Sequence, residues 1–413
     1  MKKLLFLTFT FLILAVPVLG EAKVTIKWKQ SHFGFMHPEG AYTEMQELNV
    51  HWSRPHPGEF IWGNVEDEKG NYDWSDVDEY VKKAQKKKVN IVATIWPYAD
   101  WDQAVCRKKL KKQNRQMFEQ LGDYRSKPCD MDRYQKWVRK AVERYDGDGK
   151  KDMKGLKYPI KYWEVINEPS MKGSLTFFKG SAKSYRVVLK QTSKAIKRRY
   201  PKARVLNGGA AGVSDDVFSY WRKVLRKKAK RKINIWNFHN IGGEDKLGIP
   251  EMNDFMTEKN INKNLWMTEL EFEAAAAGME GATSEEWAAY IIEQYVYAFS
   301  QDIKKIFYVG LDNSPGDEET WLIDKNGNKQ YMFYAFQTMV DKIDYFTEVD
   351  QLKANQYKFK VDDQWVYVLW GNGNPSNEIS GIVDVTDLAG TITQMDISEL
   401  DLTDSPVFVE MVQ

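Results

Sequence analysis

After its first twenty residues, the chain alternates short apolar runs with amphipathic stretches of helical period. The apolar runs that we expect to be strands are Ser31–Met36, Val50–Arg54, Asn90–Trp96, Ile160–Asn167, Arg204–Gly208, Ile233–His239, Asn264–Glu269 and Lys305–Leu311. The helical stretches between them include Trp74–Lys88, Asp132–Tyr145, Ala182–Tyr200, Asp215–Lys230, Ser284–Phe299 and Tyr331–Phe346. Because parallel strands need a long crossover connection, this alternation predicts parallel βα units. Eight such units over about 320 residues predict an α/β fold, a (β/α)8 TIM barrel with insertions.

A doubly wound sheet is the competing architecture, but no glycine-rich phosphate motif follows the first strand. Beyond Phe346 the pattern changes to short strands that are separated by turn residues. These strands are Tyr357–Val361, Val366–Trp370, Ile382–Val385, Thr391–Asp396 and Val407–Met411. We therefore assign residues 21–346 to the barrel and 347–413 to a small C-terminal antiparallel, β-sandwich-like domain. A domain of that size is expected to pack against the barrel.

The first twenty residues have the pattern of a secretory signal peptide. Lys2 and Lys3 form a basic start, Leu4–Leu19 an apolar core, and small residues up to Gly20 a cleavage site. An uncleaved membrane anchor is the alternative, which the short apolar run and Pro17 disfavour. We expect a secreted or extracytoplasmic protein with no membrane contact after cleavage.

The net charge indicates which partners to expect, and the two cysteines indicate the compartment. The full chain has 60 Lys and Arg against 58 Asp and Glu, and removing the signal takes away two lysines and no acid. A neutral mature chain gives no support for nucleic acid as a partner. Cys106 and Cys129 fit one disulfide in an oxidising compartment, with two free thiols as the alternative. The bridge would close the charged insertion Asp102–Met131 and shape a wall of the cleft at the face where βα loops gather.

Two of the expected strands end in a glutamate. One carries Trp163-Glu164-Val165-Ile166-Asn167-Glu168-Pro169, and the other carries Trp266-Met267-Thr268-Glu269. A strand in a buried sheet fixes the direction of a side chain at its end better than a loop does. Two fixed carboxylates are what cleavage of a glycosidic bond requires, one to protonate the leaving oxygen and one to attack the sugar or activate water.

These two motifs resemble the clan A glycoside hydrolases, whose fourth barrel strand carries the acid/base and whose seventh carries the nucleophile. Our strand count places Glu168 on the fourth strand and Glu269 on the seventh. The resemblance implies that Glu168 is the general acid/base and Glu269 the nucleophile of a retaining reaction, with the carboxyls roughly 5–5.5 Å apart. It also implies that Asn167 binds the sugar 2-hydroxyl and that Arg54 keeps the nucleophile ionised.

Several other residues are candidates for the site. Glu271 and Glu273 compete with Glu269, because strict alternation along a strand puts all three on one face. His239 matches a histidine that the clan often shows after the sixth strand. The tyrosine expected two residues later is Ile241 here, so the nucleophile's hydroxyl partner is unassigned. The proposed sugar-binding residues beyond these are Trp62, Trp96, Trp101, Asp312 and Trp321. Core packing is the alternative for each of these tryptophans.

One acidic turn has the composition of a calcium loop. Asp146, Asp148 and Asp152 are interleaved with glycines, and calcium prefers oxygen ligands. The terminal glutamate of an EF-hand is absent and Lys150 and Lys151 oppose a cation, so a solvated turn is the alternative. We expect no cofactor otherwise.

Taken together, the sequence predicts a secreted retaining β-glycoside hydrolase that acts on an oligo- or polysaccharide. The alternatives are a transglycosylase with the same two glutamates and a non-catalytic carbohydrate-binding protein on a barrel scaffold. The C-terminal domain has carbohydrate binding as an alternative role. The sequence carries no signal for a particular oligomeric state.

Overall fold

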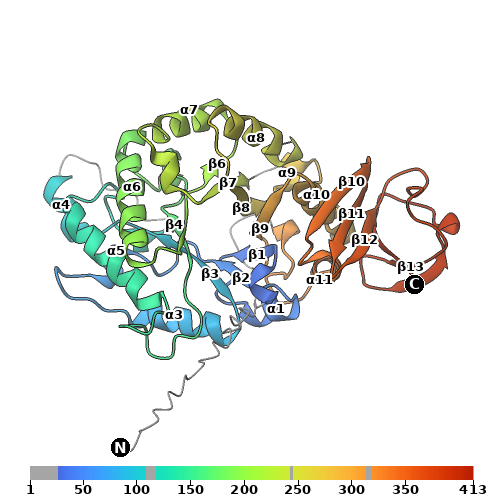
Figure 1. The fold of residues 1–413 in the computed structure, drawn as a ribbon, viewed down its shortest axis with the longest axis horizontal. Helices are drawn as coiled ribbons and strands as arrows, with labels where there is room; N and C mark the ends of the chain where they lie inside the picture. Colours follow the sequence, from blue (N-terminus) through green and yellow to red (C-terminus); the bar gives the residue numbers. More distant parts are fainter. Residues whose placement is uncertain (1–26, 108–117, 242–244, 313–317, 413) are drawn as a thin grey trace, which may run out of the picture.

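The computed structural model describes residues 27–107, 118–241, 245–312 and 318–412. The predicted signal peptide lies outside these residues. Eight parallel strands form a closed barrel with helices around it (Figure 1), which confirms the predicted TIM barrel. The barrel strands are β1 (Phe33–Met36), β2 (Trp52–Arg54), β3 (Asn90–Ile95), β4 (Tyr162–Val165), β5 (Arg204–Leu206), β7 (Ile235–Ile241), β8 (Asn264–Glu271) and β9 (Ile303–Tyr308). The β5–β7 and β1–β9 pairings close it, and the two-residue β6 (Ala210–Ala211) pairs only with β7.

The helices follow the amphipathic stretches of the sequence. They are α1 (Tyr42–Glu47), α2 (Trp62–Val65), α3 (Ser75–Lys86), α4 (Asp100–Cys106), α5 (Met131–Tyr145), α6 (Ala182–Arg199), α7 (Asp215–Val224), α8 (Ile249–Glu258), α9 (Ala274–Ala277), α10 (Ser284–Ser300) and α11 (Tyr331–Ile343). Local signals start several of them; Thr283 and Glu286, for example, form a capping box on α10. The prediction for α7 was too long, because Lys227 and Lys228 adopt left-handed φ and the helix ends at Val224. Among the described residues, no helix is long and apolar enough to span a membrane.

Side chains inside the barrel form an apolar layer below a polar one. The lower layer is a cluster of buried side chains, half of them aromatic: Trp52, Val92, Leu206, Ile235, Trp266 and Phe307. The next inward positions on four of these strands, two residues further along, are Arg54, Thr94, Asn237 and Thr268. This is the period of two expected for residues that face a barrel interior. The apolar layer seals the amino-terminal end, so the polar groups gather at the carboxyl ends of the strands, where barrel active sites lie.

The C-terminal residues form one six-stranded antiparallel sheet in the order β10-β11-β12-β15-β13-β14. Its strands are β10 (Glu348–Lys353), β11 (Gln356–Val361), β12 (Gln364–Leu369), β13 (Ile382–Thr386), β14 (Ile392–Asp396) and β15 (Val407–Met411). Sequence reasoning missed β10, whose mainly polar residues suit an exposed edge strand. The sheet lies beside α10 and α11 (Figure 1). The fold therefore has a single sheet here where the sequence suggested a sandwich-like arrangement.

Alternation along the strands gives this sheet two apolar faces. Phe359, Val368 and Phe408 belong to the same buried cluster as the barrel and its helices. Leu369 and Val409, on the other face, belong to a separate small core. One face is thus continuous with the barrel core, in agreement with the expectation that a module of this size packs on the barrel.

Candidate active site

Glu168 lies just beyond β4, in a backbone that turns sharply. Ile166 and Glu168 both adopt positive φ, at 64° and 37°, a conformation that costs energy for residues with a side chain. The Glu168 amide donates to the Gly208 carbonyl at 2.5 Å. A Cβ atom on Gly208 would lie 2.5 Å from the Ile166 carbonyl oxygen, so only glycine permits this approach. The strain brings two consecutive side chains, Asn167 and Glu168, into the site.

Glu269 reaches the site through a β-bulge. Phe238 of β7 pairs with Met267, but the next residue, His239, pairs with Glu269, so that Thr268 is the extra residue of the bulge. Thr268 and Glu269 consequently both have inward contacts. The bulge turns Glu269 inward, but Glu271 follows it at the regular period of two, so the bulge alone does not separate these two glutamates.

The competing glutamates have different environments from Glu269. Glu273 is exposed and lies beyond β8. Glu271 is partly buried, and burial raises its pKa to about 8, with the carboxylates of Glu269 and Glu273 adding to the shift. Among the described residues, Arg54 donates to neither of them, whereas Glu269 accepts a hydrogen bond from the Arg54 Nη1 atom at 2.5 Å. The arginine therefore distinguishes Glu269 from its neighbours.

Arg54 is fully buried and connects three acceptors. Its Nε atom donates to Glu164 at 2.8 Å, Nη1 to Glu269, and Nη2 to the Asn167 side-chain oxygen at 2.7 Å. Burial alone would lower the pKa of Arg54, but the carboxylates of Glu164 and Glu269 outweigh it and raise the pKa. The guanidinium therefore stays charged and holds β8, β4 and the turn that follows β4 in one geometry.

Glu164 is a buried residue beside the site that sequence reasoning missed. It is fully buried and accepts hydrogen bonds from Arg54, from the Thr94 hydroxyl at 2.7 Å and from the Asn237 side-chain amide at 2.7 Å. A signal was present, because a glutamate inside an otherwise apolar strand needs a buried partner. Its pairing with Arg54 means that the arginine neutralises two carboxylates, one structural and one at the site.

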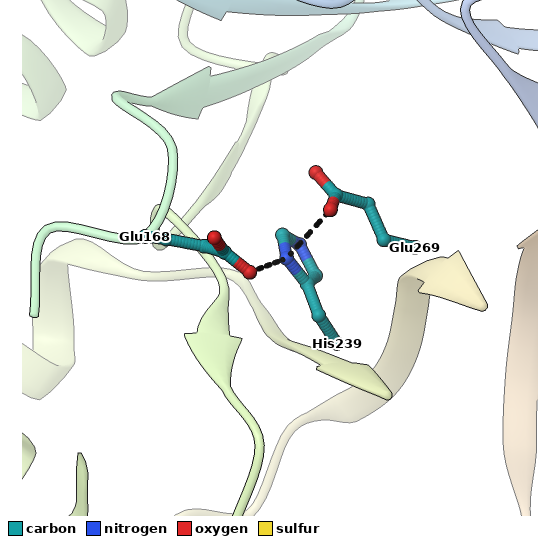
Figure 2. A group of neighbouring side chains, drawn as sticks. All are labelled: Glu168, His239 and Glu269. Atoms are coloured by element: carbon teal, nitrogen blue, oxygen red, sulfur yellow. Dashed lines mark hydrogen bonds and ion pairs between the residues drawn. The ribbon is translucent and has the colours of Figure 1, made fainter. Parts of the chain in front are cut away.

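His239 lies between the two glutamates (Figure 2). Its Nδ1 atom is 2.8 Å from Glu168 Oε1 and 3.4 Å from Glu269 Oε2, and its Nε2 atom is 3.1 Å from the Thr268 hydroxyl. A Cβ atom on Gly209, which has a φ of 61°, would overlap the His239 ring. With Ile241 in place of the expected tyrosine, Arg54 is the side chain that donates a hydrogen bond to Glu269, and His239 lies beside it.

Burial sets the protonation states of these groups. It raises the pKa of Glu168 to about 7, although Arg54 opposes the shift. Burial also raises the pKa of Glu269, against the opposing effects of His239 and Arg54. The pKa of His239 falls to about 4 because the buried ring cannot be hydrated as a cation. Near neutral pH the site therefore has a neutral histidine, a carboxyl with a raised pKa and a carboxylate in contact with a cation.

The two glutamates are close enough to act on one bond. One carboxylate oxygen of Glu168, one of Glu269 and a ring nitrogen of His239 all lie within 4.8 Å of one another. Such a trio is also a conceivable set of metal ligands, but the Arg54 guanidinium contacts Glu269 directly and opposes a second cation there. Direct hydrogen bonding between Glu168 and His239 accounts for their contact without an ion.

Two of the predicted sugar platforms are fully buried, and a third is half-buried. Trp62 is fully buried, and its Nε1 atom donates to the Glu66 carboxylate at 2.7 Å. Trp96 is also fully buried and donates to the Pro57 carbonyl at 2.7 Å. Neither ring has an exposed face on which a sugar could stack. Trp101 is half-buried, contacts the Trp62 ring edge to face at 5.1 Å and donates to the Glu66 backbone.

Asp312 and Trp321 lie in the connection after β9. Asp312 forms a short bridge with Ile323, and burial raises its pKa. Trp321 is 8% exposed, and its Nε1 atom has no hydrogen-bond partner within the part of the chain that the structure describes. A role of either residue in sugar binding stays a prediction.

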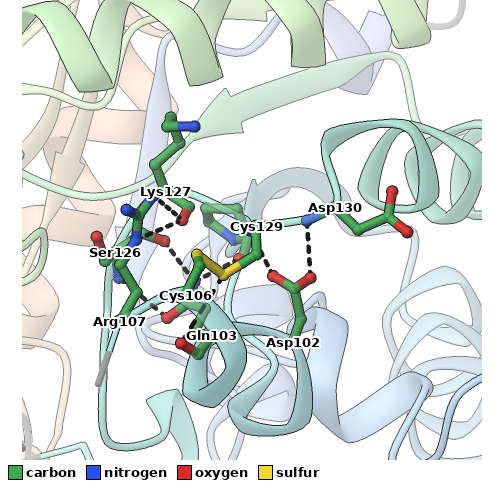
Figure 3. The surroundings of a disulfide bond; sticks show 9 residues. Asp102, Gln103, Cys106, Arg107, Ser126, Lys127, Cys129 and Asp130 are labelled. Carbon is green, nitrogen blue, oxygen red and sulfur yellow. Dashed lines mark hydrogen bonds between the residues drawn. A yellow bond between two sulfur atoms is a disulfide. The ribbon is translucent and has the colours of Figure 1, made fainter.

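The predicted disulfide between Cys106 and Cys129 is present (Figure 3). It joins the end of α4 to the turn before α5, with the two Cα atoms 5.9 Å apart. The carboxylate of Asp102 accepts hydrogen bonds from the backbone amides of Cys129 and Asp130, at 2.7 and 2.8 Å. The bridge and Asp102 thus fix the base of the insertion, part of which lies outside the described residues.

The acidic turn predicted as a calcium loop already contains a cation. Asp146, Asp148 and Asp152 come together, but the Arg199 guanidinium contacts Asp148 at 2.8 Å and Asp146 at 3.3 Å. Asp152 accepts from the Gly149 amide at 2.8 Å. A guanidinium inside the cluster supplies the positive charge that calcium would bring, which favours the alternative of a structural turn.

The chain is similar in fold to solved structures but matches no known sequence family. No protein-family model matches the chain, and no curated protein matches it in sequence. Among solved structures it is similar to a GH30 endoxylanase from Clostridium papyrosolvens, at 13% identity and a TM-score of 0.59 over 92% of this chain and 96% of that one. It is also similar to a glucosidase from Croceicoccus marinus, at 15% identity and a TM-score of 0.58 over 90% and 80% of the two chains. The endo-β1,6-glucanase BT3312 matches at 14% identity and a TM-score of 0.58, over 93% and 92%. At these identities the likeness establishes a shared fold, a barrel with a C-terminal β module.

Proposed function

We propose that the protein is a secreted retaining β-glycoside hydrolase in which Glu168 is the acid/base and Glu269 the nucleophile. The observation that carries this proposal is the pair of buried carboxyl groups with oxygens within 4.8 Å of each other. In retaining glycosidases the two carboxyls lie roughly 5–5.5 Å apart, whereas inverting enzymes separate them by about 6.5–9.5 Å to admit a water. The separation here favours direct attack by a carboxylate.

In the first step Glu269 attacks the anomeric carbon while Glu168 gives its proton to the glycosidic oxygen. The bond to the leaving group breaks, and an ester forms between the sugar and Glu269. Arg54 supports this step because its Nη1 atom keeps Glu269 ionised, while Nη2 orients the Asn167 side chain. The raised pKa of Glu168, about 7, leaves its carboxyl protonated in weakly acidic solution.

In the second step the ionised Glu168 takes a proton from water, and the water oxygen attacks the anomeric carbon. The ester breaks, the sugar leaves with its original configuration, and Glu269 returns as a carboxylate. Asn167 is placed beside Glu168 to hold the sugar 2-hydroxyl, an interaction that strengthens as positive charge develops on the ring.

The solved structures and the disulfide suggest a substrate class and a compartment for the proposed enzyme. The solved structures with this fold include xylanases, a glucosidase and a β1,6-glucanase, which makes β-linked glucosides and xylosides the first substrates to test. The disulfide supports an oxidising, extracytoplasmic location, as does the amino-terminal sequence. No metal has a role in the proposed reaction.

Covalent trapping tests the proposal. We would incubate the protein with activated aryl β-glucosides and β-xylosides that carry fluorine at the second carbon, which slows hydrolysis of the glycosyl-enzyme. We expect one sugar per protein, attached to Glu269, with release of one aryl group. Peptide mass spectrometry locates the label. Glu269→Gln should take no label, and the matched control Glu271→Gln should keep it.

The same experiment can reject the proposal. A label on Glu271, or turnover that continues in the Glu269→Gln variant, would remove Glu269 from the mechanism. Binding of oligosaccharides without label or turnover from any of the glycosides would instead favour the non-catalytic alternative.

A further inference from the structure

A chain of buried hydrogen bonds leads from Glu164 to Glu168. It begins at the Glu164 carboxylate, which accepts on both oxygens. Arg54 and Thr94 donate to Oε2, and the Asn237 side-chain amide donates to Oε1. Because an ionised carboxylate can only accept hydrogen bonds, it fixes the orientation of Asn237, with the amide nitrogen toward Glu164 and the oxygen away from it.

The fixed Asn237 oxygen then determines the direction of the Thr268 hydroxyl. Asn237 Oδ1 lies 2.8 Å from Thr268 Oγ1, and the Thr268 backbone amide is 3.3 Å from the same oxygen. An amide oxygen has no proton to give, so the Thr268 hydroxyl must donate to it. The single proton of this hydroxyl is thereby used, and any further partner of Thr268 Oγ1 must be a donor.

That further partner is His239, whose Nε2 atom is 3.1 Å from Thr268 Oγ1. His239 must therefore carry its proton on Nε2. A neutral imidazole has only one ring proton, so Nδ1 is left as an acceptor. Nδ1 lies 2.8 Å from Glu168 Oε1, and the proton in this hydrogen bond has to come from the Glu168 carboxyl.

We propose that Glu164, Asn237, Thr268 and His239 form a directional hydrogen-bond relay that sets the His239 tautomer and thereby keeps Glu168 protonated. Glu164, Asn237 and Thr268 are positioning residues that act through His239. The tautomer follows from the geometry alone, and only its consequence for catalysis depends on the proposed function. The separate pKa directions agree with it, since burial raises the pKa of Glu168 and lowers that of His239.

The relay suits a residue that alternates between acid and base. In the resting site the Glu168 hydroxyl faces His239, and it must turn toward the glycosidic oxygen to give up its proton. Once ionised, Glu168 faces a bare ring nitrogen that offers no hydrogen bond. The carboxylate is therefore destabilised, which strengthens it as the base that takes a proton from water in the second step.

Replacing Glu164 by glutamine should reverse the relay. The amide oxygen of Gln would take the place that receives Arg54 and Thr94, because two donors point there. Its NH2 group would then face Asn237, which must turn and offer its oxygen. Asn237 would donate to the Thr268 hydroxyl, and that hydroxyl would donate to His239 Nε2. The ring proton would move to Nδ1 and donate to Glu168, stabilising the ionised form of Glu168.

Nitrogen-15 NMR of the full protein with labelled histidine measures this directly, because a protonated ring nitrogen and a bare one give different shifts and couplings. We would record spectra between the pKa values of His239 and Glu168, about 4 and about 7, and assign His239 by the signal missing from His239→Gln. The wild-type protein should show the proton on Nε2. Glu164→Gln should show it on Nδ1.

Two further variants make the test specific. Thr94→Val removes a donor to Glu164 but leaves the relay intact, so the proton should stay on Nε2. Thr268→Val removes the acceptor of Nε2 without disturbing the Arg54–Glu164 pair, so the proton should move to Nδ1. Thr268→Val therefore provides the test if Glu164→Gln does not fold. Both Glu164→Gln and Thr268→Val should shift the basic limb of the kcat/KM profile to lower pH.

The outcomes separate the relay from the proposed function. A wild-type His239 with its proton on Nδ1, or reversing variants that leave the tautomer unchanged, would overturn the relay. The expected tautomers in a protein that takes no covalent label would uphold the relay and reject the hydrolase. Covalent labelling of Glu269 in a protein whose His239 carries its proton on Nδ1 would uphold the hydrolase and reject the relay.

Discussion

Removing the Glu168 carboxyl should stabilise the fold, and by an amount that depends on pH. Burial raises the pKa of Glu168 from 4.5 to about 7. Between these values the folded state holds a proton that the unfolded state has lost, so rising pH favours unfolding. A shift of about 2.5 pH units at about 1.4 kcal/mol per unit corresponds to about 3.5 kcal/mol of wild-type stability, present below pH 4.5 and lost as the pH rises through 7.

Glu168→Gln keeps the shape of the side chain, and its NH2 group can still donate to His239 Nδ1. The variant has no group to ionise, so its free energy of unfolding should exceed that of the wild type by about 3.5 kcal/mol at pH 8 and by little at pH 4.5. Equilibrium urea unfolding of both proteins across this range measures the difference, in which all other titrating groups cancel. Glu271→Gln should show a gain that keeps growing until about pH 8, since the pKa of Glu271 is about 8.

A difference between wild type and Glu168→Gln that is constant from pH 4.5 to pH 8 would refute this reasoning. It would mean that Glu168 titrates equally in the folded and unfolded states. Burial would then not control its pKa, and the assignment of Glu168 as a protonated acid would lose its physical basis.

Three other predictions concern activity and the insertion. The profile of kcat/KM against pH should be bell-shaped. It should fall above about pH 7 as Glu168 ionises, and fall on the acid side as Glu269 takes up a proton, since burial raises the pKa of Glu269 above 4.5. A profile still rising at pH 9 would contradict the assigned roles. Gly209→Ala should reduce kcat at least about tenfold because its Cβ atom would displace the His239 ring, which steady-state kinetics on an aryl glycoside would detect. Cys106→Ser should lower the free energy of unfolding by about 3 kcal/mol in urea titrations, since the disulfide closes a 23-residue separation in the unfolded chain; an unchanged urea midpoint would show that the bridge does not stabilise the fold.

The motif around β4 shows how far sequence reasoning reached. Asn167 and Glu168 were identified because strand polarity and a family resemblance place them at a strand end. Glu164, in the same motif, was missed. It is an acidic residue inside an apolar strand, four positions before Glu168, and such a residue signals a buried partner. That partner is Arg54, 110 residues earlier in the chain, and no local pattern connects them.

The tryptophans show the opposite error. Trp62 and Trp96 follow strand ends, as sugar platforms often do, but the structure buries both rings completely. A sequence gives the position of a ring along the chain and not what covers it. Their exposure depends on the path of the connecting segments, which packing determines.

The sequence by itself determined the order of strands and helices, the barrel and the ends of the strands that carry the glutamates. Hydrophobic periodicity and capping are local properties, so they can be read from neighbouring residues. Only the tertiary structure decided which glutamate of β8 meets Arg54, because the arginine comes from β2 and reaches Glu269, which the bulge at Thr268 turns inward. It also decided where the protons lie, since burial and hydrogen-bond direction depend on groups from five strands that meet only after the barrel closes.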